Sequence, residues 1–233
     1  MYLFMYLALV GECPYPILWT IIQHLIARDP KAWIRKANQK GDLEIMQYAV
    51  AQEVAQGNSQ QIDWNECIAW AAWGGHMEIV QYAVAQGDPK PRNWSSFLAW
   101  AARGGHIEMV QYIAAQTDHQ PIYWNTCIYE AAVWGHMEIV QYAIAAQRDP
   151  QQINWSWCAL SAALGGHLEI VRYAVEHGDP YQIDWDVCMT RAINADANGN
   201  GNADGAEDDG INVTGDRREL IDFIQDCQSK YQK

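Results

Sequence analysis

Oxygen-bearing side chains alternate along one segment near the end of the sequence, at a spacing that could coordinate a calcium ion. Gly201 occupies the sixth position of this segment and Glu207 the twelfth. Ca²⁺ takes about six to eight oxygen ligands, and a bidentate glutamate can close the far side of the ion. The predicted ligands are Asp196, Asn198, Asn200, Asn202, Asp204 and Glu207. Because residues 195–215 are rich in Asn, Gly and Asp and contain no Lys or Arg, the alternative is a disordered polar loop.

Histidine recurs at one position of a Gly-His-x-Glu string, in His76, His106, His136 and His167. Packed helices lie about 10 Å apart, so successive histidines of a stack would not converge on one metal ion or catalytic site. We therefore predict a structural role for them. The sequence contains no Ser-His-Asp order, Cys-x-x-Cys pair, His-Glu-x-x-His string or Gly-rich phosphate loop. We predict that the chain is not an enzyme and requires no cofactor.

Tryptophan sets the period of the chain. Spacings of 30, 30, 31 and 30 residues separate Trp64, Trp94, Trp124, Trp155 and Trp185. The next residue can cap a helix with a side-chain oxygen in every unit, as Asn65, Ser95, Asn125, Ser156 and Asp186. In the unit that starts at Trp64, small and apolar residues predict a first helix ending at Gly74-Gly75 and a second helix over about residues 77–85.

One string inside this unit, Ala71-Ala72-x-x-Gly75-His76-x-Glu78-Ile79-Val80, resembles the internal signature of ankyrin repeats. The resemblance covers about residues 31–233 and implies an all-α, ankyrin-type solenoid of stacked helix-turn-helix repeats. It also implies that each Gly-His histidine is hydrogen-bonded between adjacent turns. The period of about 30 residues is shorter than the family's usual 33 or so. We therefore expect short or irregular β-turns, similar to the arrays of large DNA viruses and protists.

The sequence divides into an N-terminal segment, residues 1–30, and an array of about six units, residues 31–233. The last unit is interrupted at 195–215. Apolar residues at helical spacing in the N-terminal segment predict a capping helix that covers the first repeat. Alternatively, Pro16-Ile17-Leu18-Trp19 with Leu25, Asp29 and Trp33 resembles a truncated F-box, which implies a ubiquitin-ligase adaptor. The 196–207 segment resembles an EF-hand or dockerin loop.

Composition restricts the partners of the chain. Its 233 residues are 50% hydrophobic and 18% charged, which predicts a folded protein. The net charge of −13 opposes nucleic acid and anionic lipid, so neither nucleic acid nor a membrane is an expected partner. No apolar run reaches the roughly 18 residues that a membrane span needs. We expect a cytoplasmic protein. The alternative is an extracellular protein, which the glycosylation sequons would favour.

Positions near the end of each first helix vary between units, whereas the packing positions do not. In ankyrin arrays, which this chain resembles, these variable positions line the concave face. Exposed Trp and Tyr are favoured at binding hot spots. The predicted partner-binding residues are Trp73, Arg103, Val133, Trp134 and Leu164, with Trp70 and Trp100 one turn earlier. We predict a protein-protein interaction scaffold whose partner is a protein. The alternative is a structural subunit that assembles with copies of itself.

Overall fold

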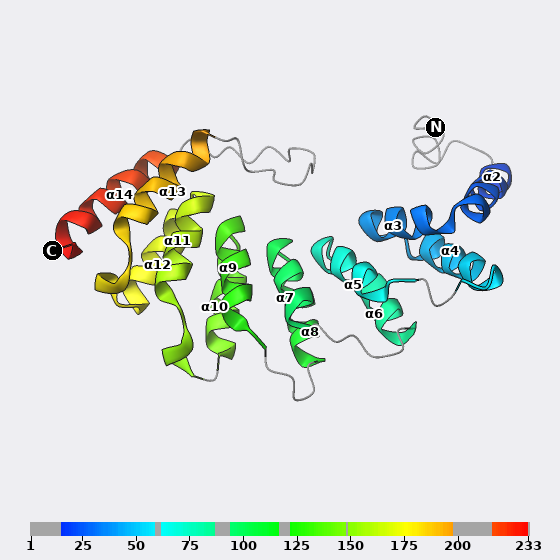
Figure 1. Cartoon of the computed structure of the whole chain (residues 1–233), viewed down its shortest axis with the longest axis horizontal. Coiled ribbons are helices and arrows are strands. Elements are labelled where there is room, and N and C mark those ends of the chain that lie inside the picture. The colour runs from blue at the N-terminus through cyan, green and yellow to red at the C-terminus, as the bar shows by residue number, and fades with distance from the viewer. Residues whose placement is uncertain are drawn as a thin grey trace. The chain divides into compact units, whose positions relative to one another are not determined.

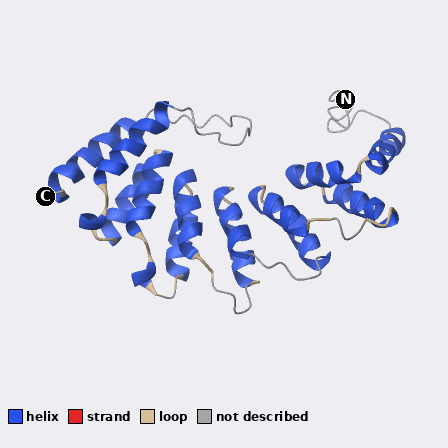
Figure 2. Cartoon of the chain, in the orientation of Figure 1, coloured by secondary structure: helices blue, strands red, loops and turns tan. Residues whose placement is uncertain are grey.

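The computed structural model describes residues 15–58, 62–86, 94–116, 122–147, 149–197 and 216–232. In these ranges every regular element is a helix (Figure 2), which confirms the predicted all-α fold. The chain forms two compact units, Met1–Pro91 and Arg92–Lys233. Among the described helices none is long and apolar enough to cross a membrane. The expected division at residue 30 remains a prediction.

The first unit consists of helical hairpins preceded by a single helix (Figure 1). Its elements are α2 (Tyr15–Arg28), α3 (Pro30–Lys40), α4 (Leu43–Ala55), α5 (Trp64–Trp73) and α6 (Met77–Gln86). Helices α3 and α4 pack together, as do α5 and α6, and the two hairpins then meet through α3 on α5 and α4 on α6. Each hairpin is one sequence repeat with a first and a second helix.

The second unit continues the same pattern through four more repeats (Figure 1). Its α-helices are α7 (Trp94–Arg103), α8 (Ile107–Ala115), α9 (Trp124–Trp134), α10 (Met137–Ala146), α11 (Trp155–Gly165), α12 (Leu168–His177), α13 (Trp185–Ala197) and α14 (Asp216–Tyr231). The first helices α7, α9, α11 and α13 pack on one another in series. Two short 3₁₀ helices, Pro150–Gln152 and Pro180–Gln182, precede α11 and α13.

Small residues allow neighbouring first helices to approach closely. Ala101 and Ala102 of α7, like Ala131 and Ala132 of α9, are fully buried. The repeated tryptophans also fill space between elements: Trp94, Trp124 and Trp185 are buried. Trp124 packs edge-on against Tyr142 of the second helix, at 6.0 Å between ring centroids. Apolar burial of this kind contributes most of the stability of a repeat stack.

The capping residues differ from those predicted. From α5 onwards the first helices begin at the tryptophan itself, so the residue after it lies inside the helix. At α5 and α11 the residue before the tryptophan is the cap. Asp63 accepts from the backbone N–H of Asn65 at 3.0 Å, and Asn154 accepts from that of Trp157 at 2.9 Å. The side chain of Asn125, predicted to cap, instead joins two repeats: its amide donates to the Gln152 carbonyl over 2.8 Å, and its oxygen accepts from Asn154 N–H.

The Gly-His histidines join consecutive repeats, as the resemblance implies. His136 Nε2–H donates to the carbonyl oxygen of Arg103 over 3.1 Å, and His167 Nε2–H donates to that of Val133 over 3.1 Å. In the first unit His76 makes the corresponding, longer bond to Gln39, at 3.5 Å. The structural role is therefore confirmed for these three histidines.

Helix α2 lies against α4 and α3 at the start of the first unit. Ile26 is fully buried there, and the ring of Trp19 lies 5.9 Å from that of Tyr48 on α4. Asp29, one of the F-box-like residues, caps α3 by accepting from Ala32 N–H at 3.2 Å. Ile21, one of the apolar residues on which the predicted capping helix rests, is exposed. These contacts give α2 a packing role, and the adaptor hypothesis stays a prediction.

Candidate binding surface on the first helices

Two of the predicted partner-binding residues lie in the first unit. Trp70 and Trp73 on α5 are half-buried, and their ring centroids are 5.5 Å apart in an edge-on arrangement. Such pairs are worth about 0.5–1.5 kcal/mol beyond the area that they bury. Part of the surface of each ring is therefore covered by the other ring on the same helix.

The other predicted residues lie in the second unit. The guanidinium of Arg103 lies over the ring of Trp100, at 5.4 Å from its centroid, and over the ring of Trp134, at 5.0 Å. The structure thus brings three predicted residues from α7 and α9 into one group. Val133 and Leu164 are half-buried at the ends of α9 and α11, and the Val133 carbonyl accepts from His167.

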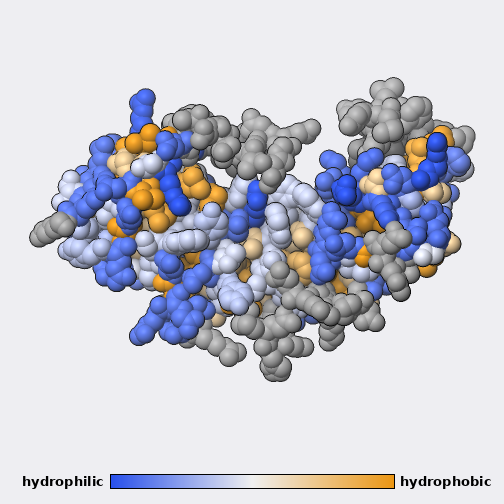
Figure 3. All heavy atoms as spheres, viewed as in Figure 1, coloured by the Kyte–Doolittle hydropathy of each residue, from blue (hydrophilic) through white to orange (hydrophobic). Residues whose placement is uncertain are grey.

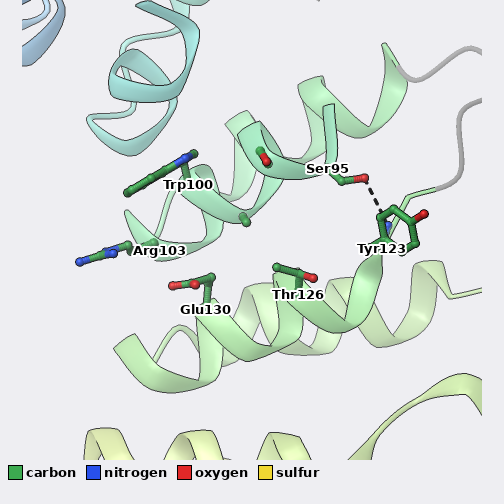
Figure 4. A pocket seen from close by; sticks show the side chains of 8 residues that line it. Ser95, Trp100, Arg103, Tyr123, Thr126 and Glu130 are labelled. Carbon is green, nitrogen blue, oxygen red and sulfur yellow. Dashed lines mark hydrogen bonds between the residues drawn. The ribbon is translucent and has the colours of Figure 1, made fainter. Parts of the chain in front are cut away.

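A hollow of about 310 Å³ lies at the junction of α7 and α9 on the same face. Its lining residues are Ser95, Ser96, Ala99, Trp100, Arg103, Tyr123, Thr126 and Glu130. Arg103 and Glu130 lie at one end of the hollow, whereas Ser95 and Tyr123 lie at the other (Figure 4). At that second end Ser95 Oγ accepts from Tyr123 N–H at 3.4 Å and ties the two repeats together. The volume is at the lower limit for small-ligand pockets.

The hollow exists because two positions carry small side chains. In the repeat alignment Ala99 of α7 corresponds to Tyr129 of α9, and Thr126 of α9 corresponds to Trp157 of α11. At the next junction these larger residues meet, with ring centroids 5.6 Å apart. The gap between α9 and α11 is thereby occupied by two rings, while the equivalent space between α7 and α9 is left open.

Glu130 is the acidic group of the hollow. Burial raises the pKa of its carboxyl above the usual range, and the nearby Arg103 guanidinium lowers the pKa only in part. The cost of removing water from the carboxylate therefore exceeds the stabilisation that the neighbouring Arg103 cation provides. A further positive charge or hydrogen-bond donor brought to Glu130 would stabilise its ionised form.

Two exposed aromatic side chains flank the hollow, and neither was predicted. Tyr123 is 66% exposed and Trp157 is 57% exposed. The signal for Trp157 was present in the sequence, since the equivalent residues of the other repeats are Glu66, Ser96, Thr126 and Val187. We call the surface formed by the hollow, Tyr123, Tyr129 and Trp157 the aromatic groove. It lies wholly within the second unit.

Comparison with protein families agrees with this architecture. A family described as ankyrin repeats (many copies) matches residues 98–144, which run from α7 into α10 and include most of the hollow. The same helical hairpin recurs before and after the matched residues. The match and the recurring hairpins support an ankyrin-repeat array. A search of curated proteins found no match.

Two of the turns between repeats are irregular within the described residues, as the sequence led us to expect. Before α11 and α13 the chain enters a 3₁₀ helix at Asp149-Pro150 and Asp179-Pro180. The carboxylate of Asp179 accepts from Tyr181 N–H at 3.1 Å and from the Gln182 side chain at 3.0 Å. Asp149 makes the matching pair of bonds, so one local motif builds both turns. The similarity to viral and protist arrays stays a prediction.

The predicted calcium ligands lie almost entirely outside the described residues. Asp196 falls in the last turn of α13, and the ligands from Asn198 to Glu207 belong to the part that is not described. Across the described ranges, no three His, Cys, Asp or Glu side chains are grouped so that they could hold a metal. Calcium binding by this ankyrin-repeat protein therefore remains a hypothesis.

Proposed function

We propose that this chain is a non-catalytic interaction module that binds a protein partner through the aromatic groove. Ankyrin repeats are generally protein-interaction modules and generally non-enzymatic. The observation that supports the groove is the open junction between α7 and α9 beside the exposed rings of Tyr123 and Trp157. Exposed aromatic rings bury much area at a small cost in side-chain entropy.

The rigidity of the stack supports the same proposal. Histidine bonds and first-helix packing order the residues of the groove during folding, so a partner meets a surface that is already formed. Less ordering entropy is then lost on binding. Apolar side chains emerge among hydrophilic ones near the C-terminal helices as well (Figure 3), but the described hollow lies between α7 and α9.

Affinity capture with matched variants tests the proposal. The intact chain, Trp157→Ala and Glu138→Ala would each capture proteins from the same extract, with the captured proteins quantified by mass spectrometry. Glu138 is exposed on the second helix α10, away from the lining residues of the hollow. We expect Trp157→Ala to lose proteins that Glu138→Ala retains. Identical captured sets for all three chains would contradict the proposal.

Two further assignments remain hypotheses beside this one. Self-assembly predicts a mass above that of a monomer in size-exclusion chromatography at micromolar concentration. The adaptor hypothesis predicts that deletion of residues 1–30 abolishes recruitment of a ubiquitin-ligase core. A cytoplasmic location is supported by the free thiols of Cys67, Cys127, Cys158, Cys188 and Cys227, because reducing compartments keep cysteines in this form.

A further inference from the structure

We propose that the hollow between α7 and α9 receives a lysine or arginine side chain of the partner, held by the Glu130 carboxylate and by the hydroxyl groups along the rest of the hollow. This inference rests on the proposed function and adds the chemistry of the partner. The occupant is a segment of another protein that carries one basic residue at the position facing the hollow.

The lining of the hollow suits a long side chain with a positively charged end. Ala99 leaves the space, and Ser96 and Thr126 place hydroxyl groups along it. Serine and threonine hydroxyls can accept hydrogen bonds from an ammonium or a guanidinium group. A cation that also reaches the Glu130 carboxylate gains a charge-assisted hydrogen bond.

Electrostatics favours a basic occupant over an acidic one. The chain carries 28 acidic and 15 basic residues, a net charge of −13, and so attracts positively charged segments at long range. Within the hollow, burial disfavours the charged form of Glu130, and the attraction of Arg103 compensates for this effect only in part. A second cation at Glu130 would supply the missing interaction.

Arg103 leaves room for this second cation. Its guanidinium is positioned by two rings, over Trp100 at 5.4 Å and over Trp134 at 5.0 Å. Arg103 and Glu130 lie at one end of the hollow, so the hydroxyl-lined remainder stays accessible (Figure 4). The partner's side chain would enter along that remainder and meet Glu130 from the side of Thr126.

The rings beside the hollow extend the contact to neighbouring residues of the segment. Tyr123 is exposed at the end that carries Ser95, and the Tyr129–Trp157 pair lies at the following junction. We therefore expect the basic residue of the partner to be accompanied by apolar residues. A highly charged segment without apolar residues would use the hollow but leave these rings exposed.

Selection from a phage-displayed library of random heptapeptides tests this inference on the full chain. We expect the recovered peptides to share lysine or arginine at one position. A synthetic peptide from this set should bind Glu130→Gln at least tenfold more weakly than wild type, as measured by isothermal titration calorimetry. Glu138→Gln removes the same charge from an exposed site on α10 and should change the affinity less than twofold.

A second variant closes the hollow with residues that the chain already uses at the next junction. Ala99→Tyr combined with Thr126→Trp copies the Tyr129–Trp157 pair and should abolish enrichment of basic peptides. Thermal unfolding checks that each variant is folded, and if the double variant does not fold, Glu130→Gln carries the test. Recovered peptides without a basic position, or equal losses in Glu130→Gln and Glu138→Gln, would overturn this inference. The proposed function would then still stand, because affinity capture tests it separately.

Discussion

His136 in one ankyrin repeat donates a hydrogen bond from Nε2 to the carbonyl oxygen of Arg103, the last residue of the first helix in the preceding repeat, over 3.1 Å. This bond fixes the end of α7, from which Arg103 reaches the aromatic groove. The position of a residue in the proposed binding surface therefore depends on a contact between repeats.

Removal of this bond should destabilise the protein. We expect His136→Ala to lower the free energy of unfolding by about 1–3 kcal/mol, because it leaves the Arg103 carbonyl without its histidine donor. Urea titration followed by circular dichroism would measure the change. Glu138→Ala, two residues further along on an exposed position, should shift the midpoint much less. Equal shifts for the two variants would show that the hydrogen bond contributes little.

Gly105 and His136 should be energetically coupled. Gly105 has φ +78°, and a Cβ atom built on it would lie 2.5 Å from the Cε1 atom of His136. Gly105→Ala should therefore destabilise the protein through backbone strain and through displacement of the ring. In a His136→Ala background the imidazole ring is absent, so the second cost disappears. The losses of unfolding free energy measured for Gly105→Ala and His136→Ala separately should therefore sum to more than the loss measured for the double variant. Additive losses would contradict the contact.

Acidification should weaken the junction. Burial lowers the pKa of His136 below its usual value, and this effect exceeds the upward effect of the bond to Arg103. The unfolded chain then binds this proton more tightly than the folded one, so the contribution of His136 to stability is complete above about pH 6.5 and decreases below it. We expect a lower thermal midpoint at about pH 5.5 than at about pH 7.5, with a smaller decrease in His136→Gln. The same decrease in both proteins would assign the effect to other groups.

The buried thiols should be unreactive in the folded protein. Burial raises the pKa of Cys67 and Cys227 to about 11 and the pKa of Cys127, Cys158 and Cys188 to about 12. At about pH 8 very little thiolate is therefore present to react with iodoacetamide. Peptide mass spectrometry should find these cysteines unmodified in the native protein and modified in urea. Rapid native modification of Cys127 would show that the α9 junction opens.

The calcium hypothesis makes a prediction of its own. If Asp196 and the five further ligands bind Ca²⁺, excess Ca²⁺ should raise the thermal midpoint above that measured with a chelator, because a ligand that binds only the folded state stabilises it. Asp204→Asn combined with Glu207→Gln would serve as the control and should remove the difference. Coincident unfolding curves for the wild-type chain would exclude the site.

The sequence predicted the parts of the fold that repeat. Every repeat packs against its neighbours through the same positions, so the residues at these positions recur, as Trp124, the alanine pairs and His136 do. One chain therefore contains several copies of the same signal. The caps of α5 and α11 were misplaced, because Asp63 and Asn154 before the tryptophan can accept hydrogen bonds just as the predicted residues after it can. Only the structure shows that the Asn125 side chain joins two repeats.

The aromatic groove was predicted only in part, because it depends on pairs of residues from different repeats. Trp100, Arg103 and Trp134 were selected one by one from their variation between units, and their mutual contact requires the packing of α7 on α9. The hollow arises from the coincidence of a small residue at Ala99 with a small one at Thr126. Neither residue is unusual alone, so single-position reasoning could not reveal the space between them.

Site-specific photo-crosslinking would show whether a partner binds at the aromatic groove. A photoreactive amino acid in place of Thr126 would stand in the aromatic groove, and the same amino acid in place of Gln141 would stand on the exposed side of the second helix α10. Bound partner would be identified by mass spectrometry after irradiation. We predict a crosslinked partner from position 126 and none from position 141. Crosslinking from position 141 alone would contradict this prediction and would place the binding surface on the second helices.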